Sequence, residues 1–331
     1  MPAKVDSSGK KKANFVAIDH SHRKPGPISY FVVFLGLGWM ITVPATMAII
    51  PFMWGHFKGL VILWCALVFL STVYTVDRAA QPAWAFKLGS WIMNNCTSYF
   101  SFKIEFEDIN AVNKSGPALF AVEPHGVLPI SVYWGSLNIL KNHKMLCCLS
   151  SSILKVPMMK HFLTWTGAIS ADKPTMLKYM KDGYSLNICP GGVQEVGYLG
   201  DPTQCVLFLN KRLGFTKLAL EQGVCIVPAM TFGLHHAYDY WVPKWEICYI
   251  LARKLRFFPM LFLGLGGVPF FQPKPCPLSV VVGKPIAIPQ VDHPTSEMIA
   301  KYHSLFVDEM KRLFEENKVS HGMGHVQLRI E

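Results

Sequence analysis

Charged residues are scarce in this 331-residue chain: they make up 16% of it, whereas apolar residues make up 51%. Soluble domains carry about 25% charged residues on average. The charges that are present give a net charge of +11, which favours an anionic partner such as a phospholipid surface. No nucleic-acid-binding motif is present, and basic residues alternate with long apolar runs. We therefore expect membrane lipid as a partner and no nucleic acid.

Three motifs of common chemistry are also missing. The nine cysteines show no C-x-x-C spacing, which argues against a disulfide or zinc framework and indicates reduced thiols in a cytosol-facing protein. The adjacent histidines His235 and His236 could suggest a metal site, but the sequence contains no H-E-x-x-H segment. We expect no metal. We also expect no cofactor. A serine hydrolase of the α/β type would carry G-x-S-x-G, and the nearest segment, GYSLN at 183–187, lacks the second glycine.

The N-terminal quarter of the chain consists of a basic segment followed by two segments without charged residues. Residues 1–27 are polar and basic and predict a disordered tail. Two uncharged runs follow, 28–54 and 59–76, and each approaches the roughly 20 residues needed to cross a bilayer. The short polar break between them predicts a membrane hairpin over 28–76 with both ends in the cytosol. Two buried helices of a soluble core are the alternative interpretation.

Beyond Asp77, strand-like and helix-like segments alternate, which is typical of a mostly parallel sheet covered by helices on both faces. The predicted strands are 118–122, 184–189, 224–230 and 278–282, and the predicted helices are 152–167, 173–182, 205–222 and 296–317. The fold class predicted is therefore α/β, with a membrane hairpin before a cytosol-facing domain over 77–331. The apolar run 257–271 is short for a membrane span and fits an interfacial segment or a buried loop and strand.

Two turns at predicted strand ends carry the candidate catalytic residues. Ligands of open α/β sheets bind beyond the carboxyl ends of the strands, and His125 follows the strand 118–122 directly. Histidine is the side chain best suited to act as a general base near neutral pH. The second turn holds Glu195, which could orient the imidazole or support the turn. The candidate oxyanion and turn residues are Pro190, Gly191, Gly192 and Gly126; the glycines among them let the backbone approach a ligand and could present N–H groups to an anion.

Five sequence blocks, in one order, resemble the diacylglycerol acyltransferase type-2 family, and especially its plant and algal branch. They are EPHGVLP, ICPGGVQE, KRLGFTKLALEQGVCIVPAMTFG, SVVVGKPI and HSLFVDEMKRLFEENK. The resemblance covers about 77–331, and the paired apolar runs before it match the family's membrane hairpin. Animal members of the family usually carry His-Pro-His-Gly, and here Glu123 takes the first position.

The resemblance implies acyl transfer from acyl-CoA to the hydroxyl of diacylglycerol, giving triacylglycerol. His125 would then remove the hydroxyl proton, and the turn N–H groups would hold the oxyanion. Related phospholipid-precursor acyltransferases orient their histidine with an Asp five residues later, where this chain has Ile130. Glu195 is our first choice for the orienting acid and Glu123 our second. The cations expected to contact the CoA phosphates are Lys211, Arg212 and Lys217.

Other interpretations stay open at this point. The acceptor could be a monoacylglycerol or a long-chain wax alcohol, because a few methylenes change specificity by only about 1–3 kcal/mol. A membrane lipid hydrolase and a non-catalytic lipid-binding protein belong to different classes. The resemblance implies a location at the cytosolic face of the endoplasmic reticulum membrane, with lipid droplets as a second location. A homo-oligomer is compatible with the sequence.

Overall fold

The computed structural model describes residues 14–37, 58–73, 83–137, 139–156, 159–255 and 258–331. Its strands are β1 (Phe15–Asp19), β2 (Lys103–Phe106), β3 (Ala118–Glu123), β4 (Lys144–Leu149), β5 (Ala168–Ser170), β6 (Tyr184–Ile188), β7 (Gln204–Leu207), β8 (Cys225–Phe232), β9 (Asp239–Trp241), β10 (Leu261–Leu263), β11 (Ser279–Val282) and β12 (Gln327–Ile330).

The α-helices are α1 (Pro27–Leu37), α3 (Lys58–Val73), α4 (Ala83–Tyr99), α5 (Ile109–Lys114), α6 (Met159–Trp165), α7 (Lys173–Lys181), α8 (Gly214–Gln222), α9 (Glu246–Leu255) and α10 (Ser296–Asn317). Short 3₁₀ segments join several of them: η2 (Ile130–Leu137), η3 (Ile153–Lys155), η4 (Gly192–Tyr198), η5 (Leu234–His236) and η6 (Leu265–Gly267).

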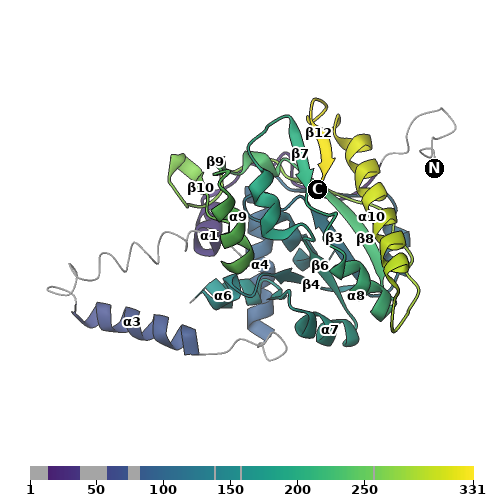
Figure 1. The fold of residues 1–331 in the computed structure, drawn as a ribbon. Coiled ribbons are helices and arrows are strands. Elements are labelled where there is room, and N and C mark those ends of the chain that lie inside the picture. The colour runs from purple at the N-terminus through teal and green to yellow at the C-terminus, as the bar shows by residue number, and fades with distance from the viewer. Residues whose placement is uncertain (1–13, 38–57, 74–82, 138, 157–158, 256–257) are drawn as a thin grey trace.

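An eight-stranded sheet lies at the centre, with the order β1-β2-β11-β8-β3-β6-β4-β5. Figure 1 shows its strands β8, β3, β6 and β4 among the surrounding helices. Strand β3 pairs in parallel with β8 on one side and with β6 on the other. Strand β8 pairs antiparallel with β11, and β1 pairs antiparallel with β2. The sheet is therefore mixed, with a parallel central part. The loops that follow β3, β6 and β8 consequently meet at one edge.

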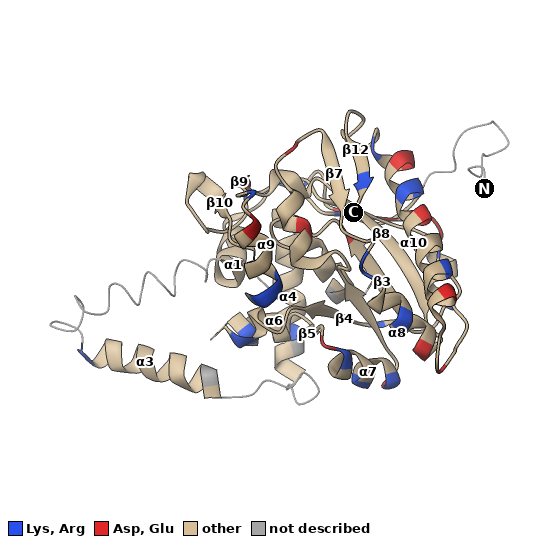
Figure 2. Ribbon diagram, viewed as in Figure 1, with Lys and Arg blue, Asp and Glu red and all other residues tan. Residues whose placement is uncertain are grey.

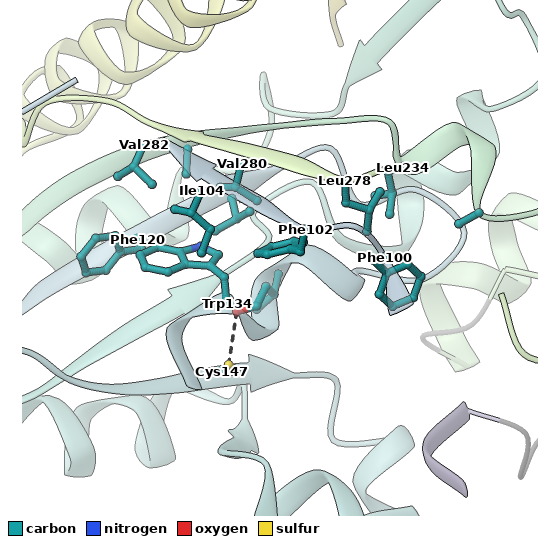
Figure 3. Packing of buried hydrophobic residues seen from close by; sticks show 14 of the residues in the cluster. Phe100, Phe102, Ile104, Phe120, Trp134, Cys147, Leu234, Leu278, Val280 and Val282 are labelled. Carbon is teal, nitrogen blue, oxygen red and sulfur yellow. Dashed lines mark hydrogen bonds between the residues drawn. The ribbon is translucent and has the colours of Figure 1, made fainter. Parts of the chain in front are cut away.

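Alternate side chains of β3 enter two different cores. Phe120 and Val122 belong to the core that includes residues of α4, η2 and α9, while Leu119 and Ala121 belong to the core formed with α7, α8 and α10. Figure 3 shows Trp134 of η2 among the aromatic and branched side chains of the first core. A strand covered on both faces reads as a continuous apolar run, which explains the run that predicted β3.

Most predicted elements of the central domain are present. The four predicted strands correspond to β3, β6, β8 and β11, and the helices predicted over 173–182 and 296–317 are α7 and α10. The helix predicted over 205–222 is wrong in its first half, because 204–207 form β7, which pairs with β12 near the C-terminus. Its second half is α8, which ends at Gly223 in the left-handed conformation, with φ of 64°.

The membrane hairpin predicted over 28–76 is wrong. Within the part of the chain that the structure describes, no helix has both the length and the apolar character needed to cross a membrane. Helix α1 has 11 residues and α3 has 16, against roughly 20 for a span. Residues 38–57 and 74–76 of the two predicted segments lie outside the described residues.

In the described part of the first run, residues 28–37, protein covers one side of the uncharged segment. Helix α1 packs against α4: Val32 and Val33 are each 1% exposed, and the ring of Tyr30 meets the ring of Tyr99 edge-on at 5.1 Å. An absence of charge indicates that a run avoids water, and contact with protein achieves this as well as contact with lipid does. Figure 2 shows how little charge α1 and α3 carry compared with α7 and α10.

Two further predictions are changed by the structure. Strand β1 lies inside the predicted disordered tail 1–27 and extends the sheet next to β2, so the ordered domain includes residues that precede Asp77. The apolar run 257–271 contains β10, which pairs with β9. Phe258 and Phe262 of this run are 1% and 2% exposed, so these side chains belong to a buried loop and strand rather than to an interfacial segment.

Candidate active site

Two loops meet beyond the carboxyl ends of β3 and β6, the parallel neighbours at the centre of the sheet. The loop after β3 carries His125 and Gly126, and the loop after β6 runs from Cys189 into η4, which carries Glu195. Gly126 has a φ of 61°, in the left-handed region, and a side chain there would meet Leu234 at 2.6 Å. Glycine at this position therefore permits the sharp turn that follows His125.

The imidazole of His125 is held by its own neighbour in sequence. Its Nδ1 atom lies 2.9 Å from the carbonyl oxygen of Gly126. A carbonyl oxygen only accepts, so Nδ1 carries the proton and Nε2 has the lone pair. Burial lowers the pKa of His125 below its ordinary value, and the bond to Gly126 partly opposes this shift. The ring is therefore neutral, and its basic nitrogen is Nε2.

Glu195 holds the main chain of His125 rather than its ring. One carboxyl oxygen of Glu195 accepts from the backbone N–H of His125, and the other accepts from the N–H of Phe208 at 3.1 Å. The prediction that Glu195 or Glu123 orients the imidazole stays a prediction; the contact that the structure gives Glu195 is to the backbone N–H of His125 and not to its ring. The carbonyl of Gly126 orients the ring, and Glu195 fixes the backbone that carries it.

Glu123, at the end of β3, lies beside Glu195. Its carboxyl group accepts from the N–H of Gly191 at 2.5 Å and from the thiol of Cys189 at 3.0 Å. The two glutamates also hydrogen-bond each other, and both are at most 1% exposed. Glu123 is thus a second link between the two loops.

The turn Pro190–Gly192 faces these groups. The N–H of Gly191 is bound by Glu123. Proline has no N–H to offer. The N–H of Gly191 is therefore used in a bond that holds the two loops together, and the oxyanion role of the other turn N–H groups stays a prediction.

A cavity of about 910 Å³ opens beside His125. Most of its wall is apolar, and it is formed by the segments that follow β3, β4 and β6 together with residues of α1, α4, α6 and the segment from α9 to β10. Its lining includes Val33, Gly36, Leu37, Met93, Phe100, Met159, Phe162, Leu163, Phe258, Met260 and Phe262. His125, Cys189 and Arg212 lie on the same wall. The cavity is at the upper end of the ~300–1,000 Å³ range of small-molecule sites and suits a long apolar ligand.

The three cations predicted to contact CoA are not equivalent. Arg212 lines the cavity and donates to the carbonyl of Gly191 at 3.1 Å. Lys217 lies 3.9 Å from Glu221 on the exposed side of α8, and Lys211 is exposed. Of the three, the structure places only Arg212 on the cavity wall.

A family comparison agrees with the predicted resemblance. The sequence pattern of a protein family described as Diacylglycerol acyltransferase matches residues 53–331. The chain belongs to this family. The resemblance recognised from the five sequence blocks is thereby confirmed, whereas membership of the plant and algal branch stays a prediction.

Curated relatives of this family member carry two kinds of names. The chain is 30% identical to acyl-CoA wax alcohol acyltransferase 2 of Mus musculus over 192 residues, which is 52% of this chain and 55% of that protein. It is 26% identical to acyl-CoA wax alcohol acyltransferase 1 of Homo sapiens over 326 residues, 91% of this chain and 93% of that one. Diacylglycerol O-acyltransferase 2 of Dictyostelium discoideum is 30% identical over 219 residues, 61% and 66% of the two chains.

Among solved structures, the chain is similar to a 1-acyl-sn-glycerophosphate acyltransferase, PlsC, from Thermotoga maritima. The TM-score is 0.43 and the sequence identity is 15%, over 88% of this chain and 97% of that one.

Several residues at the site of this family member carried no recognisable signal in the sequence. Cys189 bonds Glu123, and only its position inside the ICPGGVQE block could have indicated it. Gly36 and Leu37 of α1 line the cavity, although their run was interpreted as membrane-spanning. Outside the site, Nε2 of His303 on α10 lies 3.0 Å from the backbone carbonyl oxygen of Leu209, inside the core.

Proposed function

We propose that the protein transfers an acyl group from acyl-CoA to the free hydroxyl of diacylglycerol, forming triacylglycerol. The observation that carries this proposal is the position of His125. Its neutral imidazole lies on the wall of an apolar cavity, with Nδ1 bound to Gly126 and Nε2 as the basic nitrogen. Family membership over 53–331 supports the reaction class. Acyl-CoA enters as a substrate, and the proposed reaction uses no further cofactor.

The proposed reaction proceeds by proton transfer and addition at one carbonyl. Nε2 of His125 accepts the hydroxyl proton while the hydroxyl oxygen attacks the thioester carbon of acyl-CoA. The tetrahedral intermediate then expels the CoA thiolate, which takes the proton back from the imidazolium. An ester bond forms, the thioester bond breaks, and the histidine returns to its neutral state. The apolar wall limits water near the thioester and so disfavours hydrolysis.

A long-chain alcohol or a monoacylglycerol is the second candidate acceptor. Two of the relatives described above are named for wax alcohols, and the same general base serves any of these hydroxyls. Acceptor choice depends on the shape of the cavity, where one methylene changes binding by about 1–3 kcal/mol.

The lipid substrates suggest where the protein works. We propose that it acts at the cytosolic face of the endoplasmic reticulum and at lipid droplets. The exposed apolar side chains of α3 support attachment to a lipid surface; among them Phe69 is 65% and Leu70 is 60% exposed. Fractionation of cells that express the tagged chain tests this, and recovery of the protein only in the cytosolic supernatant would refute it.

The function is tested by expression in cells that cannot make triacylglycerol. Wild type and His125→Ala are compared, and the neutral lipids are separated into triacylglycerols and wax esters. We expect triacylglycerol with the wild type and none with the variant. Purified protein with labelled acyl-CoA then receives diacylglycerol, monoacylglycerol or a long-chain alcohol as acceptor. Wax ester as the main product favours the second candidate, and free fatty acid as the only product would refute acyl transfer.

A further inference from the structure

Two buried carboxyl groups lie side by side where the β3 and β6 loops meet. The side chains of Glu123 and Glu195 are 0% and 1% exposed, and they hydrogen-bond each other. Their acceptor atoms and the sulfur of Cys189 all lie within 4.8 Å of one another. Neither glutamate is among the described residues that line the cavity, whereas His125 and Cys189 are. The two carboxyl groups therefore act on the reaction only through other residues.

Two ionised carboxylates are unfavourable in such a place. Like charges at hydrogen-bond distance in the protein interior repel strongly, and one proton between them removes the repulsion and supplies a bond. The surroundings indicate which glutamate is charged. Glu123 accepts from the N–H of Gly191 and from the thiol of Cys189, and Glu195 likewise accepts two backbone N–H bonds; the difference is the positive charge of Arg212, which favours the ionised form of Glu123.

We propose that Glu123 and Glu195 share one proton, carried on Glu195, and that the resulting pair positions the backbone of His125 for acyl transfer. This role rests on the function proposed above. The chain of contacts is continuous: Glu195 accepts from the N–H of His125, Glu195 donates to Glu123, and Glu123 accepts from Gly191. The ring itself is held by Gly126. Glu195 thus fixes the backbone of His125, and the carbonyl of Gly126 fixes its ring.

The electrostatic surroundings support this assignment. Burial raises the pKa of Glu123 to about 7 and raises the pKa of Glu195 well above its ordinary value, with the charge of Glu123 adding to the second shift. Arg212 is the cation that faces the pair, and burial keeps the thiols of Cys189 and Cys205 protonated by raising the pKa of each. As the pH rises, Glu123 ionises first and Glu195 retains the proton.

Loss of the proton that Glu195 shares with Glu123 should slow acyl transfer, because it would displace His125. Two adjacent carboxylates would push the loops apart, and the backbone of His125 would move with Glu195. A misplacement of about 1 Å in a reacting group can cost on the order of 10²-fold in rate. We therefore expect kcat to fall on the alkaline side while the acyl-CoA KM changes little.

The decisive comparison is Glu195→Gln with Glu195→Ala. The glutamine amide can donate to Glu123 while its carbonyl accepts from the N–H of His125, and the amide never titrates; the bond from the N–H of Phe208 is lost in this variant. We expect Glu195→Gln to retain most of kcat and to lack the alkaline fall. We expect Glu195→Ala to lose on the order of 10²-fold in kcat while the acyl-CoA KM stays near that of the wild type. Glu315→Gln, which alters an exposed carboxylate on α10, serves as the matched control.

Infrared difference spectroscopy observes the proton directly. The carbonyl stretch of a buried protonated carboxylic acid should be present in the wild type and in Glu315→Gln, and absent from Glu195→Gln. A missing band in the wild type overturns the proposal, as does a Glu195→Gln variant that is as inactive as Glu195→Ala or keeps the alkaline fall. The band does not depend on turnover. Inactivity with every acceptor would therefore refute the proposed function, even where the band is present.

Discussion

The Nδ1 atom of His125 lies 2.9 Å from the carbonyl oxygen of Gly126. A main-chain carbonyl thus does for this histidine what a carboxylate does in the Ser-His-Asp triad, and it adds no negative charge beside the ring. The imidazole keeps one tautomer, with its basic nitrogen at Nε2. Because a backbone atom supplies the contact, removing a single acidic side chain does not remove the acceptor that orients the ring.

Replacing His125 should remove most of the activity of the purified protein. General-base catalysis is typically worth 10²–10⁴-fold, so we expect kcat for His125→Ala to fall by at least about 10²-fold. His236→Ala, at an exposed histidine outside the cavity lining, should keep the wild-type rate. Thermal unfolding of both variants shows whether the fold is intact. A His125→Ala protein that retains more than about a tenth of the wild-type kcat contradicts the role of this residue.

Acid should inactivate the enzyme only below the ordinary pKa of histidine. Burial lowers the pKa of His125 from its ordinary value of 6.5. A lowered pKa means that the ring stays neutral, and therefore basic, to a lower pH than a histidine in water. The acid limb of kcat/KM, which reports groups of the free enzyme, should thus have its midpoint below pH 6.5. A midpoint above that value would show that a group other than His125 controls this limb, and Glu123, whose pKa burial raises to about 7, would be the first candidate.

Sequence patterns predicted the parts of this fold whose causes are local. β3 is a continuous apolar run because both of its faces are covered, and α10 begins after Thr295, whose side chain accepts from the N–H of Met298. The prediction failed at β7, because that strand is stabilised by pairing with β12, a partner from the far end of the chain. Local periodicity contains no information about such a partner.

The site was predictable to a similar extent. The position of His125 after a buried strand pointed to its role, because strand ends are where such sheets bind ligands. The bond that Glu195 accepts from the backbone N–H of His125 depends on how two loops meet in space, and the bond from Nδ1 of His125 to the carbonyl of Gly126 depends on the exact shape of the turn. The uncharged run that includes Gly36 looked the same whether lipid or protein covered it, so its place on the cavity wall could not be read from composition.

Arg212 should matter for acyl-CoA where its neighbour Lys211 does not. Arg212 lies on the cavity wall, whereas Lys211 is exposed. A hydrogen bond to a charged group is worth about 1.5–3 kcal/mol, so we expect Arg212→Gln to raise the acyl-CoA KM by roughly tenfold or more. Lys211→Gln should leave that KM unchanged. Equal effects of the two substitutions, measured by initial rates over a range of acyl-CoA, would show that Arg212 makes no specific phosphate contact.

Acid should destabilise the fold through Glu105. Hydrogen bonds from His321 and Lys103 lower the pKa of Glu105 to about 2, from an ordinary value of 4.5. A depressed carboxyl pKa contributes stability above the unfolded-state value, and this contribution is lost as the pH falls from about 4.5 towards about 2. In Glu105→Gln, urea unfolding should show a smaller loss of stability over that interval. An unchanged dependence on pH would mean that other carboxylates control acid unfolding.

The length of acyl chain that the cavity accepts should depend on the contact between Gly36 and Phe162. Both residues line the cavity, and a Cβ atom on Gly36 would clash with the ring of Phe162. Gly36→Val should therefore push the ring into the cavity and lower kcat/KM for long-chain acyl-CoA more than for short-chain acyl-CoA. Phe162→Ala removes the ring, so the double variant should recover the long-chain substrate. If Gly36→Val reduces all chain lengths equally, or Phe162→Ala gives no recovery, this contact does not limit the chain.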